Sequence, residues 1–114
     1  MDATELILLY DYYGALLTDR QRDSFELRYN QHLSLGEIAQ ELGISRQGVH
    51  DNLTRSEALL QNMEEKTGCV RRDLHCRKAA VKIHSLAQQL TGHNDPTVSD
   101  LARQIVAEAE GLEE

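Results

Sequence analysis

The chain is poor in the residues that mark sheets, disulfide-rich folds and membrane proteins. Its 114 residues include no tryptophan, one phenylalanine, one proline and two cysteines, Cys69 and Cys76. A core built mainly from leucine, isoleucine, valine and alanine suits helices better than strands, so we expect an all-α fold. No apolar run is long enough to span a bilayer, which predicts no membrane insertion. The N-terminus lacks the basic start and cleavage site of a signal peptide, so we expect a cytoplasmic protein with reduced thiols.

Residues 33–57 contain the most informative pattern in the chain. Ser34 is a good helix N-cap, and Glu37 three residues later completes a capping box. Gly43 can adopt the positive φ of a tight turn, and Ser45 then caps a second helix. Two capped helices joined by such a turn predict a helix-turn-helix, which most often presents its second helix to DNA. The same pattern also occurs within ordinary helical bundles.

The second helix of this motif has one apolar and one polar side. Val49, Leu53, Leu60 and Met63 recur at helical spacing and should face the core. The candidate contacts with nucleic acid or another partner lie on the other side: Arg46, Gln47, His50, Asp51, Thr54 and Arg55. Arginine and glutamine at the start of a helix can reach base edges. The alternative interpretation is a solvated helix face, since charged side chains are mostly exposed in any protein.

The charge distribution argues against a strong DNA-binding protein. The formal net charge is −7, whereas DNA-binding domains usually present a basic face. Residues 45–66 carry three basic and four acidic side chains. The one basic block, a secondary candidate patch, comprises Arg71, Arg72, Arg77, Lys78 and Lys82, opposed only by Asp73. It could bind phosphates or an acidic protein surface, or it could be a charged outer face that pairs with the acidic ends of the chain.

The remaining elements also read as helices. We expect a helix at 3–17 and another from Thr18, with Gln21 in the capping-box position, to about Tyr29. The second helix of the helix-turn-helix should continue to Lys66 and stop at Thr67 and Gly68. A further helix should follow at about 70–90, with Ala79 filling a gap in its apolar stripe, and a last one should begin at Pro96 behind an Asp95 cap. This predicts a helix-turn-helix domain with an N-terminal helix at residues 1–66. Residues 67–114 are then a C-terminal helical extension that could serve as a dimerisation region.

Tyrosines, cysteines and histidines suggest no further site. Tyr10 and Tyr13 share a face with leucines and should be core residues, whereas Tyr12 should be exposed. Cys69, His75, Cys76 and His84 match no closed zinc pattern, so we expect no metal and no cofactor. No nucleophile, base and acid set or phosphate-binding glycine loop is recognisable. These observations predict a protein that is not an enzyme.

Three segments carry a resemblance to a known family. They are LYDYYGALLTDRQ, SLGEIAQELGISRQGV and DNLTRSEALL, within residues 6–66. From Thr18 to about Leu60 the chain is similar to the helix-turn-helix of sigma-factor region four. It more closely resembles the YlxM-like family of small bacterial proteins, from which it departs at Gly48 and His50. The resemblance implies an all-helical cytoplasmic protein that regulates the signal recognition particle pathway.

These observations lead to one favoured function and two alternatives. The favoured function is a regulatory binding module that acts on components of the signal recognition particle, protein or RNA, or on their expression. The alternatives are a sequence-specific DNA-binding transcription regulator and a helical adaptor that binds only protein. We also expect a homodimer, because Leu74, Ile83, Leu86, Leu90, Leu101 and Ile105 need a partner surface. The competing expectation is that the last helices fold back onto the first ones.

Overall fold

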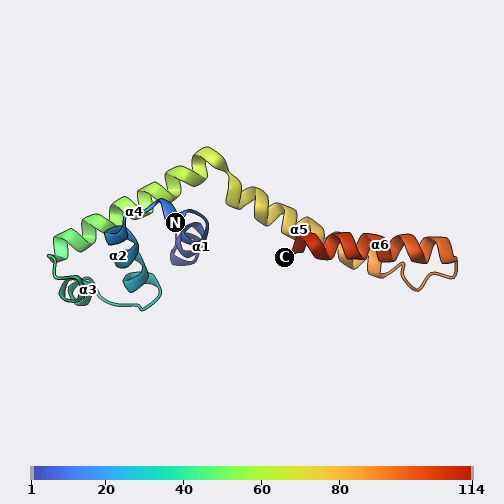
Figure 1. Cartoon of the computed structure of the whole chain (residues 1–114), viewed down its shortest axis with the longest axis horizontal. Coiled ribbons are helices and arrows are strands. Elements are labelled where there is room, and N and C mark those ends of the chain that lie inside the picture. Colours follow the sequence, from blue (N-terminus) through green and yellow to red (C-terminus); the bar gives the residue numbers. More distant parts are fainter. Residues whose placement is uncertain (1, 114) are drawn as a thin grey trace. The chain divides into compact units, whose positions relative to one another are not determined.

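A computed structural model describes residues 2–113, and these residues form an all-α protein (Figure 1). The α-helices are α1 (Ala3–Tyr13), α2 (Asp19–Tyr29), α3 (Leu35–Leu42), α4 (Arg46–Thr67), α5 (Cys69–Gln88) and α6 (Pro96–Glu113). A 3₁₀ turn, η1 (Gly14–Leu16), follows α1, and no strand occurs in the described part of the chain. The predicted fold class is therefore confirmed. The chain divides into two compact units, Met1–Val70 and Arg71–Glu114, and each is described by itself.

In the first unit, α1, α2 and α3 pack against the long helix α4 (Figure 1). Two clusters of buried side chains hold them there. One cluster joins α1, α2 and α4 and comprises Leu6, Leu9, Tyr13, Phe25, Leu60 and Val70. The other joins α3 to α4 and comprises Ile38, Ala39, Val49 and Leu53. Because α4 contributes to both clusters, its inward side is fixed along most of its length, and its outward side is fixed with it.

The first helix is shorter than expected. The sequence pattern predicted a helix over residues 3–17, but α1 ends at Tyr13, and Gly14–Leu16 form a tighter turn closed by a bond from the Leu17 N–H to the Gly14 carbonyl. A Cβ atom at Gly14 would lie 3.0 Å from the ring of Tyr10. The glycine thus lets that ring lie against the backbone, where the chain leaves the α-helix.

One carboxylate organises the end of the first unit. Glu64 Oε1 accepts hydrogen bonds from the Tyr13 hydroxyl at 2.9 Å and from the Val70 N–H at 3.1 Å. The Tyr13 hydroxyl also lies 2.7 Å from Thr67 Oγ1. Gly68 ends α4 at φ +62°, which confirms the predicted stop at Thr67 and Gly68. This network ties α1, the end of α4 and the first turn of α5 together.

The second unit is a hairpin of α5 and α6 with a seam of small residues. Ala80, Ala87, Ala102 and Ala109 are buried in it. The start of α6 is as expected, since Pro96 is its first residue and Asp95 Oδ1 accepts from the Thr97 N–H at 2.9 Å. The expected role of Ala79 is wrong: Ala79 is exposed and its neighbour Ala80 is buried. The apolar stripe of α5 is therefore rotated away from the seam.

Candidate partner-binding site

The candidate site is built on a helix-turn-helix formed by α3, the turn at Gly43 and α4. Ser34 Oγ accepts a hydrogen bond from the Glu37 N–H at 3.1 Å, and Glu37 Oε1 accepts one from the Ser34 N–H at 3.1 Å. These two bonds confirm the predicted capping box. Gly43 adopts φ +67° in the turn. Ser45 Oγ then accepts from the Gly48 N–H at 3.0 Å and starts α4. Every feature that the sequence pattern placed at this turn is present.

The turn contains a residue whose replacement should have a predictable effect. Because Gly43 has positive φ and a Cβ atom there would meet nothing within 4 Å, Gly43→Ala introduces backbone strain alone. We expect it to lower the free energy of unfolding by about 1 kcal/mol. In the matched control Gly36→Ala, the helical Gly36 should gain stability of up to about 1 kcal/mol instead. Urea denaturation measures both, and equal changes in the two variants would contradict the assigned turn.

The first half of α4 presents the polar side chains predicted as contacts. Val49, Leu53 and Ser56 are buried on its inner side. All six candidates are exposed on the other side and together are called the α4 polar face: Arg46, Gln47, His50, Asp51, Thr54 and Arg55. The structure therefore brings the predicted set onto one side of one helix. Whether these residues contact a partner stays a prediction.

Within the α4 polar face, Asp51 already has polar neighbours. Its Oδ1 accepts from Gln47 Nε2 at 3.0 Å, and His50 Nδ1 lies 3.8 Å from the same oxygen. These contacts hold Gln47 and Asp51 one helical turn apart in a defined arrangement. The Asp51 carboxylate offsets part of the positive charge of Arg46 and Arg55, so the face suits a partner with its own hydrogen-bond donors better than a phosphate backbone.

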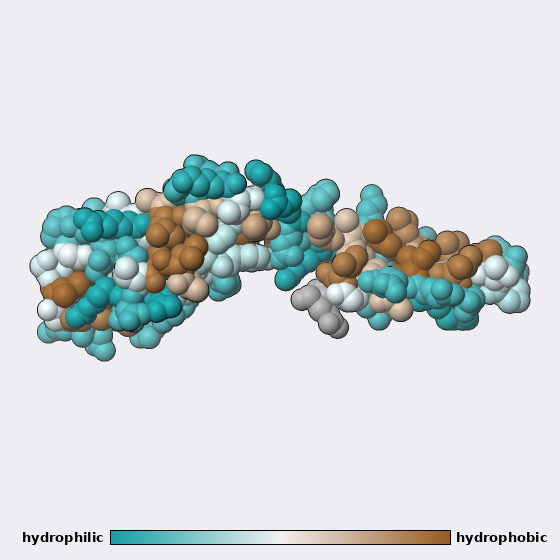
Figure 2. Space-filling model, turned by 45° about the horizontal axis from the view of Figure 1, so that its top comes forward, coloured by the Kyte–Doolittle hydropathy of each residue, from teal (hydrophilic) through white to brown (hydrophobic). Residues whose placement is uncertain are grey.

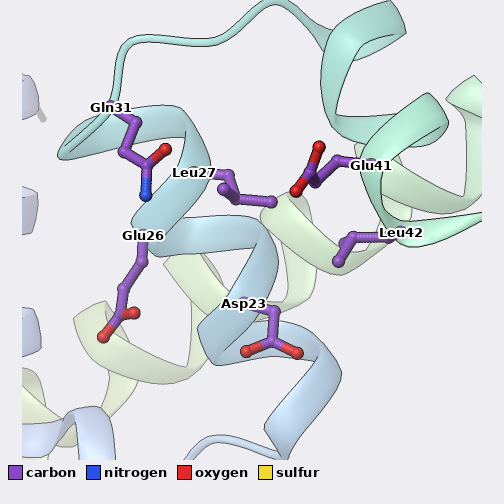
Figure 3. Close-up of a pocket in the computed structure, with 6 residues that line it drawn as sticks. All are labelled: Asp23, Glu26, Leu27, Gln31, Glu41 and Leu42. Carbon is purple, nitrogen blue, oxygen red and sulfur yellow. The ribbon is translucent and has the colours of Figure 1, made fainter.

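Helix α3, which precedes the α4 polar face, is acidic. Helix α3 carries Glu37 and Glu41 and no basic residue. A hollow of about 240 Å³ between α2 and α3 is lined by Asp23, Glu26, Leu27, Gln31, Glu41 and Leu42. Figure 3 shows Leu27, Glu41 and Leu42 pointing toward one another across this space, while the carboxylate of Glu26 points away from it. In helix-turn-helix proteins that bind DNA, the first helix of the motif crosses the phosphate backbone. Carboxylates on this helix would repel the phosphates and so disfavour DNA binding.

Two arginines of the first unit contact the backbone of the motif. Arg20 Nη1 donates to the Leu42 carbonyl at 3.1 Å, at the end of α3. Arg28 Nη1 donates to the Leu33 carbonyl at 2.9 Å, just before α3 begins. Both ends of α3 are thus fixed by side chains of α2. These bonds keep the turn in place.

The secondary basic patch lies in the second unit and is only partly continuous. Its members Arg71, Arg72, Arg77, Lys78 and Lys82 are all exposed. Arg71, Lys78 and Lys82 lie along one side of α5 because they are seven and four residues apart. Arg72 and Arg77 lie to either side of that line, and Arg77 Nε pairs with Asp73 Oδ2 at 3.4 Å. The structure thus groups three of the five predicted residues closely.

Three tyrosines fix α1 and α2 through carboxylates, and sequence reasoning missed these bonds. Tyr10 donates to Glu26 at 2.6 Å, Tyr29 donates to Glu57, and Tyr13 donates to Glu64. Tyr13 is buried and Tyr12 is exposed, as expected. Partial burial, together with the hydrogen bond to the carboxylate and its charge, raises the pKa of Tyr10 and that of Tyr29 to about 12. Both partners are distant in sequence, so no local pattern marks them.

These pKa shifts predict loss of stability at high pH. The folded state favours the neutral phenol, so the stabilisation is complete below the ordinary tyrosine pKa of about 10. It should be lost as pH rises from about 10 to about 12, where Tyr10 and Tyr29 ionise in the folded protein. Chemical denaturation across this range should show the decline, and Tyr29→Phe should show a smaller one. An ultraviolet titration in which all tyrosines ionise together near pH 10 would contradict the prediction.

Other kinds of site find no support within residues 2–113. No three histidine, cysteine, aspartate or glutamate side chains of this range gather where they could hold a metal ion. None of the helices in this range combines the length and hydropathy that a membrane crossing requires. Cys69 and Cys76 are exposed thiols.

Comparison with known proteins identifies the family. A family model, UPF0122, described as "Putative helix-turn-helix protein, YlxM / p13 like", matches residues 1–97. The chain belongs to this family. The match extends beyond the residues 6–66 on which the resemblance was noted and includes all of α5. The UPF0122 family assignment thus confirms both the helix-turn-helix and the YlxM-like resemblance.

Relatives in the UPF0122 family cover between two thirds and nearly all of the chain. A UPF0122 protein of Thermoanaerobacter sp. (strain X514) is 44% identical over 108 residues, which is 94% of this chain and 92% of the relative. One of Bacillus cereus (strain AH187) is 36% identical over 110 residues, 96% of each chain. One of Caldanaerobacter subterraneus subsp. tengcongensis is 53% identical over 78 residues, 68% of this chain and 67% of the relative. The alignments with the first two relatives are long enough to include most of α5 and α6.

Proposed function

We propose that this protein is a non-catalytic, cytoplasmic regulator that acts on the signal recognition particle pathway by binding a component of that particle. The observation that carries the proposal is the α4 polar face, in which six polar side chains lie exposed on one side of a helix whose other side is buried. A capped turn starts that helix, and two arginine bonds fix the ends of α3, which packs against it. Such an arrangement presents a rigid surface for recognition. The link to the particle comes from the YlxM-like resemblance.

The electrostatics favour the protein component of the particle over its RNA. Helix α3 carries Glu37 and Glu41 and no basic residue, and the α4 polar face itself includes the carboxylate of Asp51. Three carboxylates, those of Glu37, Glu41 and Asp51, therefore outnumber the guanidinium groups of Arg46 and Arg55, and this balance favours a basic protein surface over phosphates. RNA binding would have to use the line of Arg71, Lys78 and Lys82 on α5 instead.

A DNA-binding transcription regulator is the second candidate. It is favoured by Arg46 and Gln47 in the first turn of α4, where side chains of a recognition helix reach base edges. A helical adaptor that binds only protein is the third candidate, and it would use the same face. Salt dependence separates them, since binding to DNA weakens steeply as salt releases counterions and binding to protein need not.

We expect any affinity for random duplex DNA to be weak. The reason is the net charge of −7 together with the carboxylates of α3 and Asp51. Fluorescence anisotropy with a labelled duplex at moderate salt measures this, and the dissociation constant should be about 10⁻⁵ M or weaker. Nanomolar binding would overturn this expectation and favour the transcription regulator.

A binding experiment with a matched pair of variants tests the proposed function. The purified protein and RNA components of the particle are titrated separately with the full chain by calorimetry. The triple variant Arg46→Ala, His50→Ala, Asp51→Ala should weaken binding to the protein component at least about tenfold. The control is Asn62→Ala, Glu65→Ala, Lys66→Ala, which removes the same charges from exposed positions further along α4 and should leave affinity unchanged. Equal losses in both variants, or no binding of either component, would contradict the proposal.

A further inference from the structure

The α5–α6 hairpin exposes a row of large apolar side chains along one side. Figure 2 shows them as a brown band over the second unit. They are between 44% and 61% exposed and together are called the hairpin apolar face: Ile83, Leu86, Leu90, Leu101, Ile105 and Leu112. Ile83, Leu101, Ile105 and Leu112 line a common groove of about 500 Å³, which places residues of both helices on the same side. Leu86 shares the side of Ile83 by helical spacing, and Leu90 is exposed in the turn that follows α5.

The packing of the hairpin explains why these side chains are uncovered. The seam between the helices is filled by alanines at seven-residue spacing, Ala80 and Ala87 on α5 and Ala102 and Ala109 on α6. Small residues bring two helices close together but bury little apolar area. Two helices alone cannot then cover their own large side chains. The leucines and isoleucines lie beside the seam instead of within it.

The size of the hairpin apolar face suits a protein interface. Six leucine and isoleucine side chains, each about half exposed, amount to several hundred Å² of apolar surface. Contiguous patches larger than about 300–600 Å² on soluble proteins usually mark interaction sites. A standard interface buries about 800 Å² per partner, which this face and its polar rim can supply.

The charges of the two helices identify the occupant. Residues 71–90 carry five basic side chains and one acidic one, whereas residues 95–112 carry four acidic side chains and one basic one. Lys82 lies beside the face on α5, one position from Ile83, and Glu108 lines the groove on α6. The hairpin is thus basic along one edge and acidic along the other. A second hairpin with the same charges is complementary to it.

Two twofold arrangements can bury the face against a copy of itself. If α5 lay on α5 of the other copy, basic side chains would oppose basic ones and acidic side chains would oppose acidic ones. If α5 lies on α6 of the other copy, both edges pair opposite charges. We propose that the hairpin apolar face is covered by a second copy of this chain, in a four-helix bundle that packs each α5 against α6 of the other copy. This inference is independent of what the α4 polar face binds.

Sedimentation equilibrium at micromolar protein tests whether the hairpin apolar face is the dimer contact. The full chain should sediment as a dimer, and Ile105→Glu should raise the dimer dissociation constant at least about tenfold because a carboxylate would be buried. The control is Ala107→Glu, which adds the same charge to an exposed position on α6 away from the groove. It should dimerise like the parent. A monomeric parent, or equal behaviour of the two variants, would overturn the proposal.

A charge exchange tests which helices meet. Lys82→Glu alone and Glu108→Lys alone should each raise the dissociation constant about threefold to tenfold, because each places like charges at both edges. An equimolar mixture of the two variants should recover the parent affinity, since every edge of the mixed dimer again pairs opposite charges. Pairing within one chain predicts no recovery on mixing. Pairing of α5 with α5 predicts no loss in either single variant, and either result would overturn the proposed arrangement.

Discussion

Replacing Ala39 by glutamate should unfold the first unit or lower its thermal midpoint by many degrees. Ala39 is 8% exposed and lies in the cluster that joins α3 to α4, with Ile38, Val49 and Leu53. Its methyl group is buried where α3 packs against α4. Burying a carboxylate there without a partner costs several kcal/mol, a large fraction of the stability of a small domain. Circular dichroism during heating measures the change.

The control for Ala39→Glu lies at the next position. Gln40 is exposed on the same helix, so Gln40→Glu introduces the same carboxylate into water and should leave the thermal midpoint nearly unchanged. If Ala39→Glu melted at the same temperature as Gln40→Glu, α3 would not be packed on α4 as described. The helix-turn-helix would then lose its structural basis.

Truncation of Phe25 should be the most damaging change in the other cluster. Its side chain is fully buried, and its ring centroid lies 4.5 Å from that of Tyr10 and 4.5 Å from that of Tyr29. Phe25→Ala removes this packing and leaves a cavity among α1, α2 and α4. We expect the free energy of unfolding to fall by about 3–5 kcal/mol.

Urea denaturation with Tyr12→Ala as a control measures the Phe25 effect. Tyr12 is an aromatic residue of α1 whose side chain is 36% exposed, so its truncation should cost far less. A loss below about 1 kcal/mol for Phe25→Ala would show that the three aromatic rings do not form the centre of this cluster.

Local features of the fold could be predicted because they depend on residues within a few positions of one another. The capping boxes at Thr18 and Ser34, the turn at Gly43 and the stop at Gly68 all occur as expected. Each satisfies backbone groups at a helix end through a neighbour in sequence. The polar face of α4 followed from the same reasoning, since a helix with one buried side must expose the other.

Contacts between distant residues could not be predicted. The Glu64 network joins Tyr13, Thr67 and Val70, and Asn52 Nδ2 lies 3.4 Å from the fully buried Ser24 Oγ. The sequence has no pattern that pairs a given tyrosine with a given carboxylate across more than ten positions. Such bonds form because helix packing brings the groups together, and packing depends on the whole set of buried side chains.

The α5–α6 hairpin shows a second limit of pattern reading. The apolar stripe of each helix is wide. Periodicity alone does not determine which residues within the stripe form the contact between α5 and α6. The structure uses alanines such as Ala80 for the seam and leaves leucines such as Leu86 outside. A stripe composed of both small and large residues can therefore serve two contacts. We infer that the small residues join the two helices and the large ones join two chains.

Mapping the binding surface on the isotope-labelled full chain tests the central claim most directly. Backbone amide resonances are followed while the unlabelled protein component of the signal recognition particle is added, and then in a second titration its RNA. The account predicts that the protein component shifts resonances concentrated at residues 46–55 of α4, around the α4 polar face. Shifts confined to other residues, or none with either component, would contradict the claim that this face is the binding site.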